Sequence, residues 1–392
     1  MRKKLKDVCM FYSGTGFPIQ YQGQTKGEYP FYKVGDIANN AIAGKIYLEL
    51  CNNYISSDVA KMIKGCILPK DTVVFAKIGE ALKLNRRAIT SCDCLIDNNA
   101  MGIAPKLDSL RIQYFYFCMK NLKMQTLAES TTVPSVRKTV LEKYEIEVPS
   151  LVEQEEIEKK LTLTQKIIEK RRQELSYLDE IIKARFVEMF GDPIKNPKGW
   201  EVVTIGDIVT EVRYGTSKPA VEGGKYPYLR MNNLTADGHL DLNDLKYIDI
   251  PDDEIEKCVV RKGDVLFNRT NSIELVGKTV VFDLQEDMII AGYIIRVRLN
   301  KRLLPEILSQ YMNLEALKDI LRSMAKGAVN QANINAQELR SIKVYIPDME
   351  LQKQFIEMKN QVDKSKFDTM TFAPIYDIIN LYLHTHFYQG RR

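Results

Sequence analysis

Basic and amide side chains gather after two strand-like segments of the sequence. The run that ends at Ala76 is followed by Lys77, Lys83, Asn85, Arg86 and Arg87. The second group contains Arg230, Asn232, Asn233, Arg269, Thr270 and Asn271. Arginine and lysine can donate to guanine, asparagine can pair with adenine, and hydroxyls and cations can hold phosphates. These residues are candidates for contacting DNA, and the simpler alternative is that they form solvated turns.

Side chains that would carry out catalysis are missing from the spacings that catalysis requires. Val276-Gly-Lys-Thr has the tail of a phosphate-binding loop, but Ser272 stands where its first glycine must be. Cys92 and Cys94 have no second cysteine pair at zinc-ligand spacing, and three histidines leave little for acid–base chemistry. No dinucleotide fingerprint and no Asn/Asp-Pro-Pro-aromatic motif of adenine methyltransferases is present. We expect a non-catalytic binding protein with no metal and no cofactor.

Composition bounds the class of protein. The 392 residues, 45% hydrophobic and 27% charged, suit a soluble globular chain of two or three domains. No apolar run is long enough for a membrane helix, and seven scattered cysteines suit free thiols in a reducing cytoplasm. Residues 1–150 hold 21 Lys and Arg against 14 Asp and Glu, which suits a polyanionic partner. Residues 191–350 hold 21 against 24, so phosphate contacts there must come from local patches.

The chain contains an internal duplication with an offset of about 195 residues. Three segments recur in the same order. They are Gly27-Glu-Tyr-Pro-Phe-Tyr with Gly224-Lys-Tyr-Pro-Tyr-Leu, Lys70-Asp-Thr-Val-Val-Phe with Lys262-Gly-Asp-Val-Leu-Phe, and Ile146-Glu-Val-Pro-Ser-Leu-Val-Glu-Gln with Val344-Tyr-Ile-Pro-Asp-Met-Glu-Leu-Gln. The order and the comparable gaps indicate two homologous copies of one module.

The same kinds of element are expected in both copies. Residues Thr72–Ala76, Val265–Phe267 and Met288–Val297 have the β-branched and aromatic composition of strands. Residues Tyr114–Ala128 and Pro305–Met324 have the pattern of helices. Tyr114, Tyr116 and Phe117 are expected in the core. Each copy is therefore an α+β module followed by a helix.

The helix after the first copy is expected to be long. From Leu151 to Phe190 no proline or glycine interrupts the chain, and Gly191-Asp-Pro ends it. Forty residues at 1.5 Å each give a rod of about 60 Å. Its apolar stripe, which most simply forms intramolecular core, contains Ile157, Leu161, Ile168, Leu175, Leu178 and Ile182.

A second helix after Pro347 is the expected partner of that stripe. Thr369-Met-Thr-Phe-Ala-Pro should break it, and the tail does not repeat the end of the first helix. We expect a first domain over 1–150, a spacer helix over 151–190, a second domain over 191–347, and a second spacer helix over 348–392 with an atypical tail that is altered or truncated.

Two α+β copies, each leading into a helix through Pro-x-x-x-x-Gln, resemble the DNA-specificity subunits of type I restriction–modification systems. The residues that carry the resemblance are Glu145-Ile-Glu-Val-Pro-Ser-Leu-Val-Glu-Gln, its second copy from Lys343, and Arg185-Phe-Val-Glu-Met-Phe-Gly-Asp-Pro followed by Pro197-Lys-Gly-Trp-Glu. The resemblance covers residues 1–365.

The resemblance implies two target-recognition domains that each read one half of a split sequence in double-stranded DNA. It implies long antiparallel, coiled-coil-like helices that space the domains and dock two methyltransferase (modification) subunits. Adenine methylation, translocation and restriction would belong to partner subunits. The faces that flank the apolar stripe would bind these partners, through Lys166, Lys170, Arg172 and Glu180.

Three alternatives remain open from the sequence. The chain is a structural coiled-coil scaffold, a defective or rearranged specificity subunit, or a cryptic DNA methyltransferase or nuclease with its own active site. Turnover by the purified chain would favour the enzyme, and loss of methyltransferase binding would favour the defective subunit.

Overall fold

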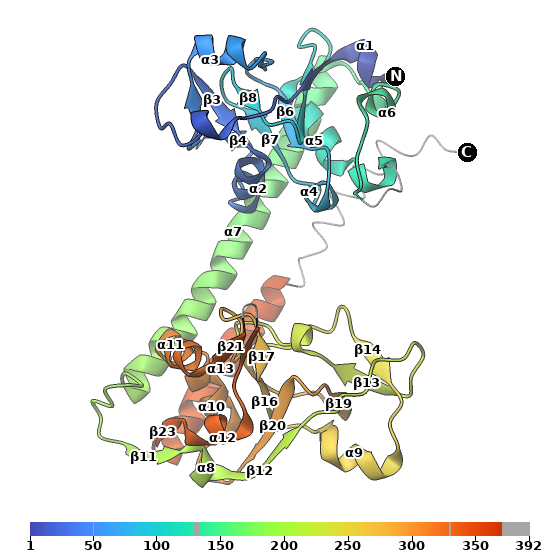
Figure 1. Cartoon of the computed structure of the whole chain (residues 1–392). Coiled ribbons are helices and arrows are strands. Elements are labelled where there is room, and N and C mark those ends of the chain that lie inside the picture. Colours follow the sequence, from blue (N-terminus) through green and yellow to red (C-terminus); the bar gives the residue numbers. More distant parts are fainter. Residues whose placement is uncertain (50, 129–132, 329–330, 371–392) are drawn as a thin grey trace. The chain divides into compact units, whose positions relative to one another are not determined.

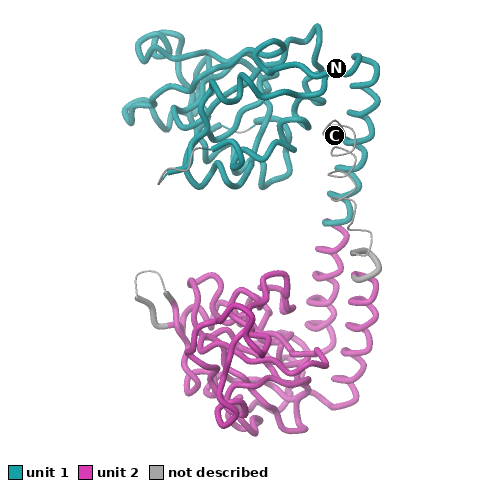
Figure 2. The backbone as a smooth tube through the Cα atoms, turned by 90° about the vertical axis from the view of Figure 1, so that its right-hand side faces the viewer, with its two compact units in different colours: residues 1–172, 371–392 teal, residues 173–370 magenta. Residues whose placement is uncertain are grey.

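The computed structural model describes residues 1–49, 51–128, 133–328 and 331–370. The described chain divides into two compact units, residues 1–172 and residues 173–370 (Figures 1 and 2). One helix, α7 (Leu151–Phe190), begins in the first unit and ends in the second, as the sequence predicts. The predicted tail after residue 370 lies outside the described residues.

Two packed sheets form the body of the first unit. The larger sheet has the described strand order β2-β9-β6-β7-β4, and the smaller has the order β5-β3-β8. The strands are β2 (Cys9–Ser13), β3 (Tyr29–Tyr32), β4 (Tyr47–Leu48), β5 (Tyr54–Ile55), β6 (Val73–Ala76), β7 (Arg87–Thr90), β8 (Leu95–Ile96) and β9 (Ala100–Pro105). A separate pair joins β1 (Arg2–Lys4) to β10 (Glu145–Glu147).

Helices pack on both faces of the larger sheet and against the smaller sheet. They are α1 (Leu5–Val8), α2 (Val34–Ile42), α3 (Ser57–Met62), α4 (Glu80–Lys83), α5 (Ile112–Asn121) and α6 (Lys138–Glu142), with 3₁₀ turns at Ile19–Tyr21 and Met124–Leu127. Strand β6 alternates between two cores. Val73 and Phe75 pack with α5 and the start of α7, whereas Val74 packs toward the smaller sheet. Tyr114, Tyr116 and Phe117 are buried in the first of these cores, as expected.

The second unit repeats this plan. Its sheets have the described orders β12-β20-β16-β18 and β14-β13-β19-β15. The strands are β12 (Val209–Tyr214), β13 (Tyr226–Leu229), β14 (Lys246–Ile248), β15 (Val259–Val260), β16 (Val265–Asn268), β18 (Thr279–Val281), β19 (Met288–Ile290) and β20 (Ile294–Leu299). Strand β11 (Glu201–Thr204) pairs with β23 (Lys343–Ile346), as β1 pairs with β10.

A small sheet and several helices complete the second unit. The small sheet has the order β17-β22-β21, from β17 (Thr270–Asn271), β22 (Gln331–Asn333) and β21 (Lys326–Ala328). The helices are α8 (Ile205–Ile208), α9 (Asp252–Cys258), α10 (Pro305–Met312), α11 (Glu315–Met324), α12 (Ala336–Ser341) and α13 (Met349–Met370), with a 3₁₀ turn at Met231–Asn233.

The strand register makes the duplication residue-specific. Strand β6 pairs Val73 with Ile103 of β9, and β16 pairs Val265 with Val297 of β20. The parallel pairing of β3 with β8 recurs in the second unit as the parallel pairing of β13 with β19. Residue 73 therefore corresponds to residue 265, and the same registers match the other strands of the two sheets.

Three of the predicted elements are wrong in extent. The single strand expected over Met288–Val297 is two strands, because a turn at Ala291 to Tyr293 carries the chain from β19 to β20. The helix expected over Pro305–Met324 is α10 and α11, separated at Asn313. The Asn313 amide bonds the Thr279 carbonyl at 2.6 Å, a tertiary contact that the helical pattern does not reveal. The helix expected over Tyr114–Ala128 is α5, which ends at Asn121 and is followed by a 3₁₀ turn at Met124–Leu127.

A buried glutamine ties each long helix to its module and explains the repeated Pro-x-x-x-x-Gln motif. The Gln154 amide donates to the Ser109 and Pro149 carbonyls at 2.8 and 2.9 Å, and its oxygen accepts from the Arg111 N–H. Both this side chain and that of Gln352 are fully buried.

Gln352 makes the same three bonds in the second unit. Its amide donates to the Arg302 and Pro347 carbonyls at 3.1 and 2.8 Å, and its oxygen accepts from the Leu304 N–H at 2.9 Å. The NH₂ and the oxygen of one side-chain amide thus satisfy three backbone groups. Replacing the glutamine therefore leaves these three groups without their partner.

Within the second unit, α13 lies antiparallel to the 173–190 part of α7 (Figure 2). Phe186 and Phe190 of α7 pack edge-on against Phe355 of α13, with ring centroids 5.2 and 5.6 Å apart, and all three rings are buried. Further along, the Lys366 ammonium lies 2.5 Å from Asp179. The predicted antiparallel packing of the two helices is therefore confirmed in this unit.

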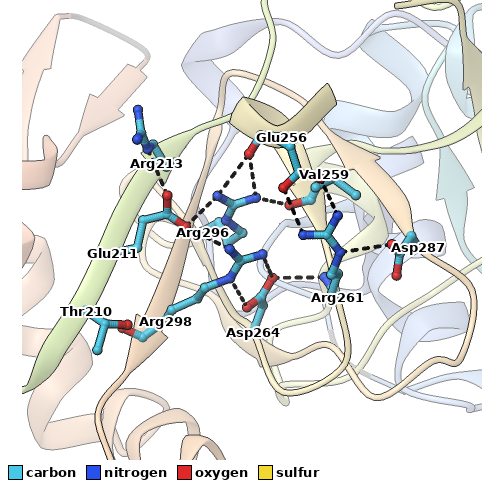
Figure 3. A network of polar contacts seen from close by, with 10 residues as sticks. All are labelled: Thr210, Glu211, Arg213, Glu256, Val259, Arg261, Asp264, Asp287, Arg296 and Arg298. Carbon is cyan, nitrogen blue, oxygen red and sulfur yellow. Dashed lines mark hydrogen bonds and ion pairs between the residues drawn. The ribbon is translucent and has the colours of Figure 1, made fainter. Parts of the chain in front are cut away.

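A network of ionic side chains surrounds the buried Arg296 in the second unit (Figure 3). The fully buried Arg296 donates to the Val259 carbonyl and to Glu211, and Arg298 bridges Glu211 at 2.9 Å and Asp264 at 2.8 Å. Burial acts to raise the pKa of Glu211, but the Arg213 hydrogen bond and the charges of Arg296 and Arg298 outweigh it and lower this pKa. The carboxylate therefore stays charged at neutral pH.

Substituting Leu for Gln352 should lower the free energy of unfolding of the second unit by about 3 kcal/mol, because a backbone N–H and two carbonyls lose their partners. Urea unfolding followed through Trp200 measures this change. Trp200 is the one tryptophan of the sequence, and its indole N–H donates to the Phe190 carbonyl in this unit.

Gln354→Leu is the matched control, since Gln354 is exposed two residues further along the same helix. We expect this variant to change the free energy of unfolding by less than about 0.5 kcal/mol. Equal losses in the two variants would contradict the anchoring role of Gln352.

Candidate nucleic-acid interface

Lys77 and Arg269 occupy corresponding positions in the two units. Each follows an inner strand, β6 of the five-stranded sheet or β16 of the four-stranded sheet that corresponds to it. The Lys77 N–H donates to the Asn99 carbonyl at 2.8 Å, and its carbonyl accepts from the Val136 N–H. Arg269 makes the same pair of bonds, with the Tyr293 carbonyl and the Ile334 N–H. We call this pair of backbone hydrogen bonds the cradle. Two candidates from the sequence thus lie in the same cradle of the two units, and both side chains are partly exposed.

Of the next two candidates in the first cluster, Arg86 lines a pocket and Lys83 does not. Arg86 borders a cavity of about 320 Å³ together with Lys45, Lys120, Gln165, Glu169 and Arg172. Lys83 is exposed and lies 2.7 Å from Glu80 in an ion pair. The cavity has more cationic than anionic lining residues. Arg86 therefore has more basic surroundings than Lys83, which is paired with a carboxylate.

Two members of the first cluster hold the protein itself together. Asn85 has a positive φ of 53°, and its amide oxygen accepts from Arg87 and from the Met124 N–H. The Arg87 guanidinium, 2% exposed, donates to the Asn85 and Leu122 carbonyls. Burial lowers the pKa of Arg87 to about 9, so it remains a cation inside the fold. The prediction that Arg87 contacts DNA is revised, because its donors face the protein.

The turn after β13 holds the next three candidates. Arg230 donates to Asp244 at 2.7 Å, and Asn232 is exposed. Asn233 is buried, with its oxygen bonded to the Arg230 N–H and its amide to the Asp241 carbonyl. Asn233 therefore closes the turn, and the prediction that it reads a base is revised for this reason.

The segment after β16 contains the last three. Thr270 is buried and donates to Asn333 at 2.8 Å, so its predicted DNA contact is also revised. Asn271 bonds Asn268 and the Ser272 N–H. The Arg269 guanidinium lies 4.8 Å from the centre of the Tyr214 ring. Its Nε is buried and has no hydrogen-bond partner among the residues that the structure describes.

The predicted partner-binding residues lie on exposed positions of α7. These are Lys166, Lys170, Arg172 and Glu180. The apolar stripe beside them changes along the helix. Ile157, Leu161 and Ile182 are buried, whereas Ile168, Leu175 and Leu178 between them are partly exposed. The core role expected for the stripe therefore holds at its two ends in the described chain.

The residues set aside as catalytic motifs have internal partners. The Lys278 ammonium of Val276-Gly-Lys-Thr donates to the Met231 and Leu234 carbonyls. All seven cysteines are free thiols. In the described chain, no group of three His, Cys, Asp or Glu side chains is placed to hold a metal ion. Nor does a helix of that part have the length and hydropathy to cross a membrane.

The sequence reasoning missed Tyr214. This residue ends β12, is 42% exposed, and accepts a hydrogen bond on its hydroxyl from the Ala336 N–H at 2.8 Å. A signal was available, since Ser13-Gly-Thr and Tyr214-Gly-Thr precede corresponding turns. Only the strand register, however, brings Tyr214 beside Arg269.

Replacing Arg87 with alanine should lower the free energy of opening of the first unit by about 2–3 kcal/mol, since two buried carbonyls lose their donor. Hydrogen exchange of the amides in β6 and β7 measures this, and Arg86→Ala should leave their protection nearly unchanged. Equal protection in both variants would show that the buried guanidinium does not stabilise the fold.

The chain is similar to two curated proteins over part of its length. It is 32% identical over 171 residues to the putative type I restriction enzyme MjaX specificity subunit of Methanocaldococcus jannaschii, covering 43% of this chain and 40% of that protein. It is 24% identical over 256 residues to the type I restriction enzyme EcoKI specificity subunit of Escherichia coli, covering 61% and 55%. The chain thus spans about half the length of these relatives.

The fold is similar to a solved structure described as "Structural basis underlying complex assembly and conformational transition of the type I R-M system". The TM-score is 0.55 at 17% identity, over 98% of this chain and 96% of the other. The family model of the type I restriction modification DNA specificity domain matches residues 1–177 and again residues 197–373. With two tandem matches that together cover most of its length, the chain belongs to the family of type I restriction modification DNA specificity domains.

Proposed function

We propose that this chain is the sequence-specific DNA-binding subunit of a type I restriction–modification complex. Each α+β module reads one half of a bipartite target in double-stranded DNA, and the subunit itself catalyses no reaction. Adenine methylation and restriction are carried out by partner subunits, which this chain directs to the target.

The observation that carries the proposal is the repeated cradle of Lys77 and Arg269. A cationic residue follows the corresponding inner strand of each module, and its backbone N–H and carbonyl make the same two hydrogen bonds. Cations at such equivalent places suit two contacts with one polyanion, and arginine also suits base edges. Tandem matches to a family of DNA specificity domains support the same reading.

The domain boundaries proposed for this function follow the sequence. Residues 1–150 form the first target-recognition domain, 151–190 the spacer helix and 191–347 the second recognition domain. Residues 348–392 form the second spacer helix, of which those after 370 lie outside the described residues.

The DNA-contacting set comprises the candidates whose side chains reach solvent, Lys77, Lys83, Arg86, Arg230, Asn232 and Arg269, with Asn85 and Asn271 as supports of their turns. Two methyltransferase subunits dock on the exposed faces of α7, through Lys166, Lys170, Arg172 and Glu180. The restriction and translocase subunits join through the complex. Supporting this assignment, these four side chains are exposed beside a partly exposed apolar stripe.

The proposal is tested by mapping methylated adenines in the host genome with and without this gene. We expect a bipartite methylation motif that disappears on deletion and returns with the intact gene. An unchanged set of methylated sites, or methylation by the purified chain with methyl donor alone, would contradict the proposal.

Arg269→Ala should weaken recognition of one half-site. Losing a bidentate base contact costs about 1–3 kcal/mol, so discrimination at one base pair should fall at least about fivefold. Methylation mapping of the variant complex measures this. Arg302→Ala is the matched control, because Arg302 lies between β20 and α10 and is paired with Glu201. Equal loss at both half-sites would contradict the assignment of Arg269 to one of them.

Inserting a duplicate of seven residues after Lys170 should lengthen α7 by about 10 Å, which is about three base pairs of duplex. A seven-residue insertion returns the apolar stripe close to its original face. We expect both half-sites to be retained and only the gap between them to lengthen, as read from the methylation motif. A variant that methylates the original motif would show that the helix does not set the gap.

A further inference from the structure

The contact between Tyr214 and Arg269 distinguishes the two modules at their corresponding cations. Tyr214 pairs with Ile295 in the sheet, and the residue at the same register in the first unit is Ser13, which pairs with Met101. Ser13 is exposed and has no ring. Arg269 therefore lies over an aromatic face, whereas Lys77, its counterpart, has a short hydroxyl at that place.

The Tyr214 ring is fixed at both ends. Its backbone belongs to β12, and its hydroxyl accepts from the Ala336 N–H at the first residue of α12. A guanidinium held over such a ring loses rotational freedom, so the directions open to its Nη donors are restricted. The ring therefore acts on Arg269 as a rigid platform that itself remains 42% exposed.

The backbone of Arg269 is held as firmly as its side chain. The Tyr293 carbonyl and the Ile334 N–H bond it on either side, at 3.0 and 2.9 Å. Thr270 and Asn271, its neighbours, use their polar atoms on Asn333 and Asn268. The Arg269 guanidinium contacts the Tyr214 ring instead, and its buried Nε has no hydrogen-bond partner among the described residues.

An oriented guanidinium and a flexible ammonium recognise different parts of DNA. The planar fork of arginine matches the O6 and N7 acceptors of guanine, and a fixed orientation gives this match its specificity. Lysine is a compact charge on a flexible stem, which suits phosphate contacts that carry no sequence information.

We propose that Tyr214 is a positioning residue that holds Arg269 for reading a guanine in the half-site of the second module, while Lys77 supplies sequence-independent phosphate attraction in the first. This inference rests on the proposed DNA-binding function. It assigns different tasks to two cations that share one backbone position.

The test uses the full chain in complex with its modification subunits and duplexes that carry the methylated target or single base-pair changes in it. We expect Tyr214→Leu to lower discrimination at one G·C pair of one half-site by about tenfold, the value of a good bidentate contact. Tyr214→Phe keeps the ring and loses only the bond to Ala336, so it should restore most of the discrimination. Tyr247→Leu, an exposed tyrosine of β14, is the matched control.

The lysine is tested in the same assay through its salt dependence. Lys77→Ala should weaken binding to all duplexes by a similar factor and lower the slope of log affinity against log salt by about one. It should leave the ranking of the duplexes unchanged.

The outcomes separate this inference from the proposed function. If the unaltered complex prefers no sequence, the proposed function fails. If it does discriminate but Tyr214→Leu discriminates equally, or Phe loses as much as Leu, only the positioning role is overturned. Relaxation at an A·T pair would overturn the assignment to guanine, and altered sequence ranking in Lys77→Ala would overturn the phosphate role.

Discussion

The buried amide of Gln154, repeated by Gln352, connects everything else in this chain. A long helix can present a docking face or set a distance only if its first turn is fixed to a module. Each glutamine does this by bonding the end of the preceding strand and the backbone that leads into α5 or α10. Because the amide is fully buried, its three bonds are made together or broken together, so the direction in which each helix leaves its module is well defined.

The second constraint is the pairing of α7 with α13 inside the second unit. Three aromatic rings close this pairing near the module, and an ion pair from Lys366 to Asp179 extends it. Burial of the Lys366 ammonium acts to lower its pKa, but the hydrogen bonds that it donates to Asp179 and Asp363 outweigh this and raise it. The cation is therefore fully charged at neutral pH, and its ion pair with Asp179 favours one alignment of the two helices.

Sequence reasoning predicted what depends on periodicity and order, and it missed what depends on tertiary contacts. The helix over 151–190 and the two tandem α+β modules follow from spacing and from motifs repeated in order. The break at Asn313 does not, because it is stabilised by Thr279 from a distant strand. Arg87 and Arg86 are identical in type and adjacent, yet Arg87 is buried and Arg86 is partly exposed. Only the packing of β7 against α5 separates their roles.

The two modules share a strand register but differ in the side chains that fill their interiors. At the register positions of Glu211, Arg296 and Arg298, the first unit has Met10, Gly102 and Ala104. A side chain at Gly102 would meet Leu68 at 2.4 Å, so aliphatic packing fills the volume that a buried arginine fills in the other copy. The backbone bonds around Lys77 and Arg269 are nevertheless the same. The interior and the side chains at these two positions therefore differ between the modules, while the backbone around them stays the same.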